Sequence, residues 1–150
     1  MRIGTIAIIV AAVTLVVTAG CSYFSKVDKP QLAFNVGKFS TIAYMAEKDK
    51  LSQSNQDAVT KAWELFRDNA GKVTADNIRS FPDMLKEQGT SKIPNAAMRD
   101  KVNALIDKYW ANLNKSLNLD GAGGDELVAI INALKDGIQA GLDQAAKPTA

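Results

Sequence analysis

The acidic residues beside a glycine-rich turn are the side chains best suited to hold a metal ion. Asp120, Asp125 and Glu126 lie in the run NLDGAGGDE, residues 118–126, and carboxylate oxygens are ligands that Ca²⁺ and Mg²⁺ prefer. Two positions that would have to supply oxygen ligands in an EF-hand loop are alanines, and the run lacks the Gly-Lys-Ser/Thr ending of a phosphate loop. We therefore expect an interhelical connection and keep the three acids only as weak metal candidates.

The composition removes most common catalytic chemistry. The 150 residues include no histidine and one cysteine, which excludes histidine general bases, Ser-His-Asp and Cys-His pairs and ordinary zinc sites. The only glutamates, at 47, 64, 87 and 126, fit capping or exposed helical positions, although two acids distant in the chain could still meet as a hydrolase pair. We expect no enzyme activity and no cofactor.

The charge balance argues against nucleic acid as a partner. Lys and Arg number 18 against 16 Asp and Glu, and no long basic stretch is present. Nucleic-acid-binding domains usually carry a concentrated positive surface. The sequence therefore predicts no nucleic-acid binding.

The single cysteine follows an apolar N-terminal run. Residues 3–19 carry no charge and come after Met1 and Arg2, the order of a basic and then an apolar region that is typical of a secretory signal peptide. The run ends in the small residues Thr18, Ala19 and Gly20, directly before Cys21. This ending resembles the lipobox of bacterial lipoproteins, although Thr18 stands where that family usually has Leu.

The resemblance to bacterial lipoproteins implies a lipid anchor. It implies that residues 1–20 are removed as a signal peptide and that Cys21 carries acyl chains such as palmitate on its thiol and on the new amino terminus. Ser22 resembles the residue that directs Gram-negative lipoproteins to the outer membrane, so we expect a position there, facing the periplasm. The alternative is that residues 3–19 remain as an uncleaved signal anchor.

Helical spacing runs through the rest of the chain. Residues 21–29 form a short tether that reaches about 30 Å at most, which would keep the following domain near the membrane. Apolar residues then recur every three or four positions, without the alternation that marks strands. We predict one domain over 30–146, an all-α antiparallel bundle of about four main helices plus one short kinked segment, and a disordered tail at 147–150.

Local signals predict where the helices begin, end and are interrupted. They cover 30–49, 54–71, 75–88, 94–117 and 125–146, with Ser54 as a cap, Pro82 as an interruption and Gly89 as a stop. The first presents a stripe of Leu32, Val36, Phe39, Ala43 and Ala46. The fourth presents Met98, Val102, Leu105, Ile106, Tyr109, Trp110, Leu113 and Leu117, which predicts the central element of the core.

Two features are candidates for contact with a partner. Small residues recur every fourth position at Ala129, Ala133, Gly137, Gly141 and Ala145, which favours close packing, either within the chain or between copies of it. Tyr109 and Trp110 point about 100° apart on a helix, so at most one can face the centre of the core. We expect these rings to pack in the core or in a groove between helices, and an exposed ring that anchors a partner protein or a glycan is the alternative.

The sequence therefore predicts a binding or structural module for a protein of the cell envelope, held to the membrane through lipidated Cys21. A homo-oligomer is a further candidate assembly. One alternative is an exclusion or immunity lipoprotein that blocks phage or plasmid entry. Another is a protein that binds peptidoglycan or acts on the cell wall as an enzyme.

Overall fold

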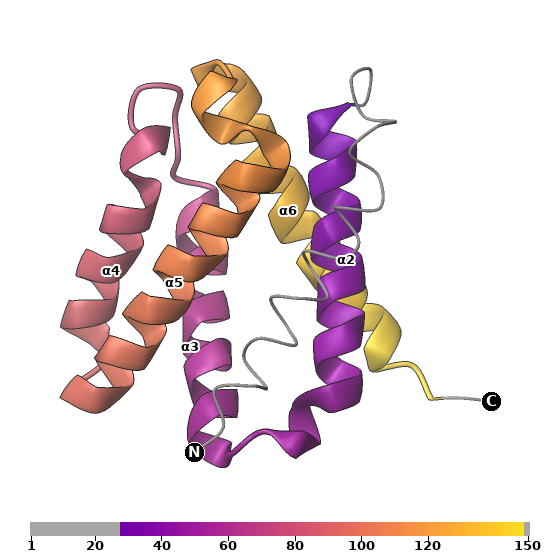
Figure 1. Cartoon of the computed structure of the whole chain (residues 1–150), viewed down its shortest axis with the longest axis vertical. Coiled ribbons are helices and arrows are strands. Elements are labelled where there is room, and N and C mark those ends of the chain that lie inside the picture. The colour runs from indigo at the N-terminus through magenta and orange to yellow at the C-terminus, as the bar shows by residue number, and fades with distance from the viewer. Residues whose placement is uncertain (1–27, 149–150) are drawn as a thin grey trace. The chain divides into compact units, whose positions relative to one another are not determined.

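Residues 28–148 are described by the computed structural model, and they are all-α (Figure 1). The α-helices are α2 (Lys29–Glu47), α3 (Gln53–Ala70), α4 (Phe81–Lys92), α5 (Ala96–Leu117) and α6 (Gly124–Ala145). Three short 3₁₀ turns, η2 (Lys48–Lys50), η3 (Ile78–Ser80) and η4 (Leu119–Gly121), complete the described elements, which include no strand. The predicted all-α bundle class is confirmed. The signal peptide, Cys21 and most of the tether lie outside the described residues.

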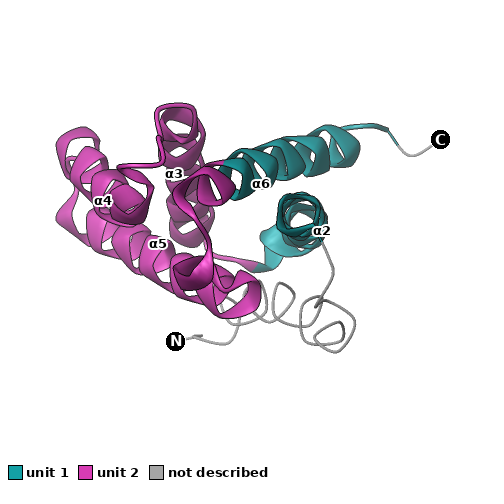
Figure 2. Ribbon diagram, turned by 90° about the horizontal axis from the view of Figure 1, so that it is seen from above, with its two compact units in different colours: residues 1–50, 129–150 teal, residues 51–128 magenta. Residues whose placement is uncertain are grey.

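The single domain expected over 30–146 contains two compact units (Figure 2). Unit 1 comprises residues 1–50 and 129–150, of which the structure describes α2, η2 and most of α6. Unit 2 comprises residues 51–128, with α3, α4, α5 and the first turn of α6. Helix α6 therefore begins in unit 2 and continues in unit 1.

Unit 2 is a three-helix arrangement in which consecutive helices alternate in direction (Figure 1). Lys101, early in α5, donates a hydrogen bond to Ser54 at the start of α3, so these two helices run the same way. Phe81 at the start of α4 packs against Trp110, late in α5. Helix α4 therefore runs opposite to both of its neighbours.

Aromatic rings form the centre of unit 2. Phe81 is fully buried, and its ring centroid lies 5.7 Å from that of Phe66 and 6.3 Å from that of Trp110. Trp63 extends the series, with its ring 6.0 Å from Phe66. Such tilted and edge-to-face pairs add to the free energy gained by burying the rings. Unit 2 also buries these aliphatic side chains: Leu65, Ile78, Leu85, Val102, Ile106 and Leu113.

Several predicted helix ends in unit 2 were wrong. Ser52, not Ser54, caps α3, because its Oγ accepts the backbone N–H of Asn55 at 3.3 Å. Gly89 does not stop α4 but lies buried inside it, where a Cβ atom would come within 3.2 Å of Leu65 Cδ1. Pro82 occupies the first turn of α4, so it begins a regular helix after η3 rather than kinking one.

Unit 1 is built on a close crossing of α2 and α6 at three glycines. A Cβ atom at Gly37 would lie 2.6 Å from the carbonyl oxygen of Leu134, and one at Gly141 would lie 2.7 Å from that of Lys38. A Cβ at Gly137 would overlap the carbonyl group of Phe34. Because positions later in α2 meet positions later in α6, the two helices cross in the same direction. Their backbones are in direct contact.

The buried face of α2 differs from the predicted stripe. Its buried residues are Ala33, Val36, Gly37, Ser40 and Thr41, whereas Phe39 is 51% exposed and Ala46 is also exposed. Apolar residues surround α2, so their spacing selects no single face, and the approach at Gly37 decides which side is covered. The two buried hydroxyl groups, on Ser40 and Thr41, donate to the carbonyl oxygen of Gly37 at 3.2 and 2.7 Å.

An ion pair joins α4 to α5 and gives a pH-dependent prediction. Lys86 Nζ donates to Asp107 at 2.8 Å, and this bond raises the pKa of Lys86 above its ordinary value of 10.5, with Asp83 adding to the effect. A raised folded-state pKa stabilises the fold below 10.5, and this contribution is lost as pH rises through the folded-state pKa.

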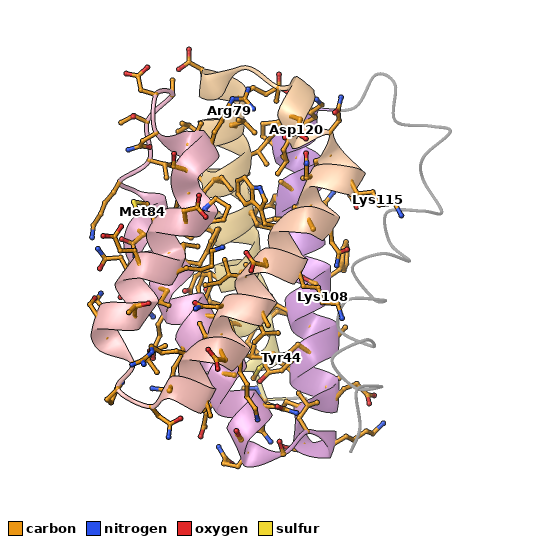
Figure 3. All side chains as sticks on the ribbon, turned by 60° about the vertical axis from the view of Figure 1, so that its left-hand side comes forward. Tyr44, Arg79, Met84, Lys108, Lys115 and Asp120 are labelled. Atoms are coloured by element: carbon orange, nitrogen blue, oxygen red, sulfur yellow. The ribbon has the colours of Figure 1, made fainter. Side chains whose placement is uncertain are left out.

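We expect Asp107→Asn to remove that contribution. Urea unfolding below and well above pH 10.5 should then show a smaller loss of stability in Asp107→Asn than in the native chain. The control is Lys108→Gln, at an exposed position of α5 next to Asp107 in the sequence (Figure 3). It should lose as much stability between the two pH values as the native chain does. Equal pH dependence in the native chain and Asp107→Asn would contradict the prediction.

Candidate binding groove

The glycine-rich connection is a tight structural turn, and its acids have structural surroundings. Asp120 accepts a hydrogen bond from Asn114 Nδ2 at 2.7 Å, and its own N–H donates to Asn114 Oδ1 at 3.0 Å. Asp125 and Glu126 stand in the first turn of α6, where carboxylates complement the helix dipole. Within residues 28–148, no three acidic, histidine or cysteine side chains gather as a metal site would require.

Contacts with the segment between α3 and α4 also fix this connection. Asn118 adopts the left-handed conformation, with φ of 49°, and ends α5. Arg79 Nη2 donates to the carbonyl oxygen of Ala122 at 2.8 Å, and a Cβ at Gly124 would lie 2.6 Å from the carbonyl oxygen of Ala75. Figure 3 shows Arg79 and Asp120 at the same end of unit 2. The glycines here permit close packing.

Most of the residues predicted to contact a partner pack against other residues of their own unit. Gly137 and Gly141 are buried against α2, which is the packing within the chain that the sequence offered as one of two alternatives. Trp110 is half-buried and belongs to the aromatic series of unit 2. Tyr109, beside it, is also half-buried.

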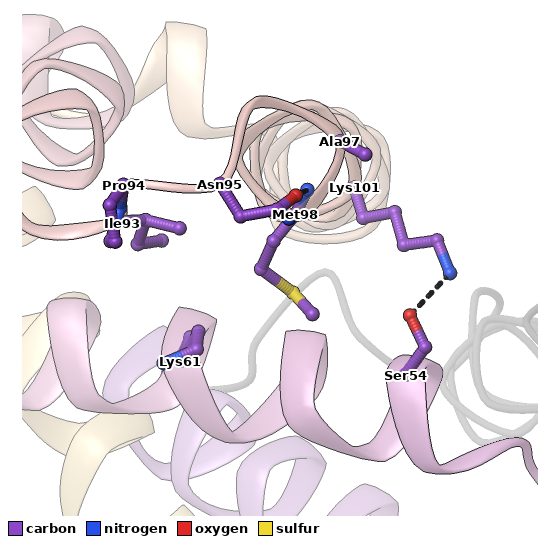
Figure 4. Close-up of a pocket in the computed structure, with 8 residues that line it drawn as sticks. All are labelled: Ser54, Lys61, Ile93, Pro94, Asn95, Ala97, Met98 and Lys101. Atoms are coloured by element: carbon purple, nitrogen blue, oxygen red, sulfur yellow. Dashed lines mark hydrogen bonds between the residues drawn. The ribbon is translucent and has the colours of Figure 1, made fainter.

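An open groove in unit 2 is the concave feature that best fits binding. Its volume is about 440 Å³, within the range of roughly 300–1,000 Å³ typical of ligand clefts. It lies between α3, the α4–α5 connection and the start of α5 (Figure 4). The lining residues are Ser54, Lys61, Ile93, Pro94, Asn95, Ala97, Met98 and Lys101. Met98 points from α5 toward α3 in the middle of this groove.

The lining of the groove carries positive charge on two lysines. Lys101 Nζ donates to Ser54 Oγ at 2.7 Å and to Asn55 Oδ1 at 3.2 Å, both of which are neutral acceptors. No described residue forms an ion pair or hydrogen bond with Lys61. The lining includes no Asp or Glu. Lys101 therefore keeps its attraction for an incoming anion.

Two helix N-termini strengthen this positive field. Because α3 and α5 run in the same direction, both begin at the groove, and Asn95 caps α5 by accepting the N–H of Met98 at 2.9 Å. Neither helix has an acid in its first turn, whereas α4 has Asp83 and α6 has Asp125 and Glu126. Helix N-termini favour negative charge, so both add to the attraction of the groove for an anion.

The acids of this region lie in a separate depression farther along α3. Its volume is about 90 Å³, and its lining includes Glu64, Asp68 and Lys92 as well as Lys61. The surface therefore changes from positive to mixed charge along α3. The larger groove remains the positive part.

The groove is suited to binding rather than to covalent chemistry. Its hydroxyl group, on Ser54, accepts from Lys101, and no carboxylate stands beside it as a base. From the spacing of apolar residues, we predicted Met98 as part of the core stripe of the fourth helix. That spacing did not indicate the groove. Lys61 and Lys101 are forty positions apart in the chain and line the same groove only through the packing of α3 on α5.

No family model matches the sequence, and no curated protein or solved structure is significantly similar to it.

Proposed function

We propose that the chain is a lipid-anchored binding module that holds an envelope protein near the membrane surface, without a chemical step. The observation that carries the proposal is the open groove of unit 2, where Lys61 and Lys101 flank an apolar floor with no acid in the lining. Uncompensated charge beside exposed apolar side chains favours recognition of a partner of opposite charge.

The N-terminal sequence supports the anchored part of the proposal. The apolar run that ends at Cys21 resembles a lipoprotein signal, and several acyl chains at about 0.8 kcal/mol per buried methylene would hold the protein at the membrane. None of the described helices is long and apolar enough to cross a membrane. We propose that the protein is attached through Cys21. The expected place is the outer membrane, with the protein facing the periplasm.

Replacing the acylation site tests the anchor. We expect Cys21→Ser to abolish labelling with an alkyne analogue of palmitate and to move the protein out of the membrane fraction, because no thiol remains to be acylated. Lys147→Cys in the Cys21→Ser background restores a thiol far from the apolar run, and as the control for position it should restore no labelling. A Cys21→Ser protein that stays in the membrane would indicate an uncleaved signal anchor over residues 3–19.

Binding is tested in the same cells by crosslinking and mass spectrometry of the tagged full chain. The expected product is one dominant envelope protein. Crosslinks only to further copies of the chain would contradict the proposed role and indicate a homo-oligomeric structural protein. A change in phage or plasmid entry on expression of the chain alone would instead favour the exclusion alternative.

A further inference from the structure

We infer that the groove of unit 2 is the docking site for an acidic segment of a partner protein, with carboxylates at Lys61 and at Lys101 and an apolar side chain on Met98 between them. This inference rests on the proposed binding function and names the surface and the partner chemistry that it uses. The segment would lie across the start of α5, where Pro94, Asn95 and Ala97 form the opposite wall (Figure 4).

Charge complementarity identifies the occupant as acidic. Two ammonium groups line the groove, and the lining offers no carboxylate to either of them. Lys101 is held in place by Ser54 and Asn55, so its charge is positioned before a partner arrives. The N-termini of α3 and α5, both without acids in their first turns, add attraction at the same place.

The apolar floor identifies the second element of the segment. Met98 is half-buried and Ile93 is buried, while Pro94 and Ala97 are exposed. Methionine adapts its shape to different apolar groups and is common at peptide-binding surfaces. A side chain such as leucine placed beside the carboxylate would cover this floor.

A protein segment fits the groove better than an anionic lipid surface does. Membrane-surface sites rely on aromatic residues at the headgroup level and on clusters of four or more basic residues, each contributing about 1 kcal/mol. The groove is lined by two lysines and by no Trp or Tyr. It is also concave, whereas a bilayer surface presents no projecting segment to fill it.

Site-specific photocrosslinking in intact cells tests the inference. The full chain would carry p-benzoylphenylalanine at Ala97, an exposed groove residue, or at Ala111, which is exposed on α5 about 21 Å farther along the helix. We expect capture of one protein from position 97 and not from 111. The crosslinked peptide should contain Asp or Glu next to an apolar residue.

Charge reversal supplies the decisive comparison. We expect Lys61→Glu together with Lys101→Glu to reduce capture from position 97 about tenfold, and replacement of the partner's acids by lysine to restore it. Lys108→Glu with Lys115→Glu, two exposed positions of α5 (Figure 3), is the matched control and should leave capture unchanged. Lys61→Glu alone, at a side chain without internal bonds, gives a second variant whose fold is not at risk.

The outcomes separate failure of the groove from failure of the function. Capture that resists charge reversal, equal capture from position 111, or a phospholipid adduct at position 97 would overturn the inference. If position 97 captures nothing while general crosslinking still finds a dominant partner, the assignment of the groove as the docking site is wrong. The proposed function then stands. If neither method finds a partner, both are wrong.

Discussion

Replacing Gly137 by valine is expected to lower the free energy of unfolding by about 3 kcal/mol. Any Cβ at this position would overlap the carbonyl group of Phe34, and backbone atoms of a packed helix cannot move aside as a flexible side chain can. The neighbouring contacts at Gly141 and Gly37 would open with it, because they belong to the same crossing. Urea unfolding of the chain from residue 22 onward, followed by circular dichroism, measures the loss.

The direction of the stability change in an alanine variant is a sharper test of the close packing at Gly137. Gly137→Ala should also destabilise, although alanine favours a helix interior over glycine by about 1 kcal/mol. Gly71→Ala is the matched control, because a Cβ there meets nothing within 4 Å and φ is −74°. That change should be neutral or slightly stabilising. A stabilised Gly137→Ala would show that α2 and α6 do not pack closely in solution.

Truncating Phe81 to alanine is expected to cost about 3–5 kcal/mol, the usual range for a large buried aromatic side chain. The ring is fully buried and packs between Phe66 and Trp110, so its loss leaves a cavity at the centre of unit 2. The near-ultraviolet circular dichroism of the tryptophans should also weaken, since Trp110 loses the ring that fixes its orientation. Urea unfolding gives the magnitude.

Phe39→Ala is the control for the loss of a phenylalanine from a helix. Phe39 is 51% exposed on α2, so we expect a change within about 0.5 kcal/mol. A cost at Phe39 as large as that at Phe81 would contradict the observed burial of the two rings. It would then favour the stripe that the spacing of α2 had suggested.

Local signals predicted which segments are helical but not always where they begin. Two serines two positions apart, Ser52 and Ser54, lie where α3 begins, and serine is a good cap. Ser52 is the cap, and its neighbour Leu51 is buried and accepts a hydrogen bond from Gln56 Nε2 at 3.2 Å. The position of the helix start thus depends on tertiary burial, which spacing along the chain does not contain. Tertiary packing also explains the wrong helix end predicted at Gly89. This glycine packs on Leu65 inside α4 and does not end the helix.

The faces and partners of the helices required the structure. The small-residue strip on α6 correctly indicated close packing, yet nothing in it named α2 as the opposing helix, about one hundred positions earlier in the chain. The groove was missed for a related reason. Met98 follows the spacing of a core residue, and only the packing of α5 on α3 places it between Lys61 and Lys101.

The measurement that tests the proposed function most directly is crosslinking and mass spectrometry on intact cells, with the native chain and Cys21→Ser compared at equal expression. We predict one dominant envelope protein crosslinked to the native chain and its loss when Cys21→Ser leaves the membrane. A native chain that crosslinks to no other protein would contradict a binding role. An identical set of partners and an unchanged membrane location in Cys21→Ser would contradict anchoring through the lipid.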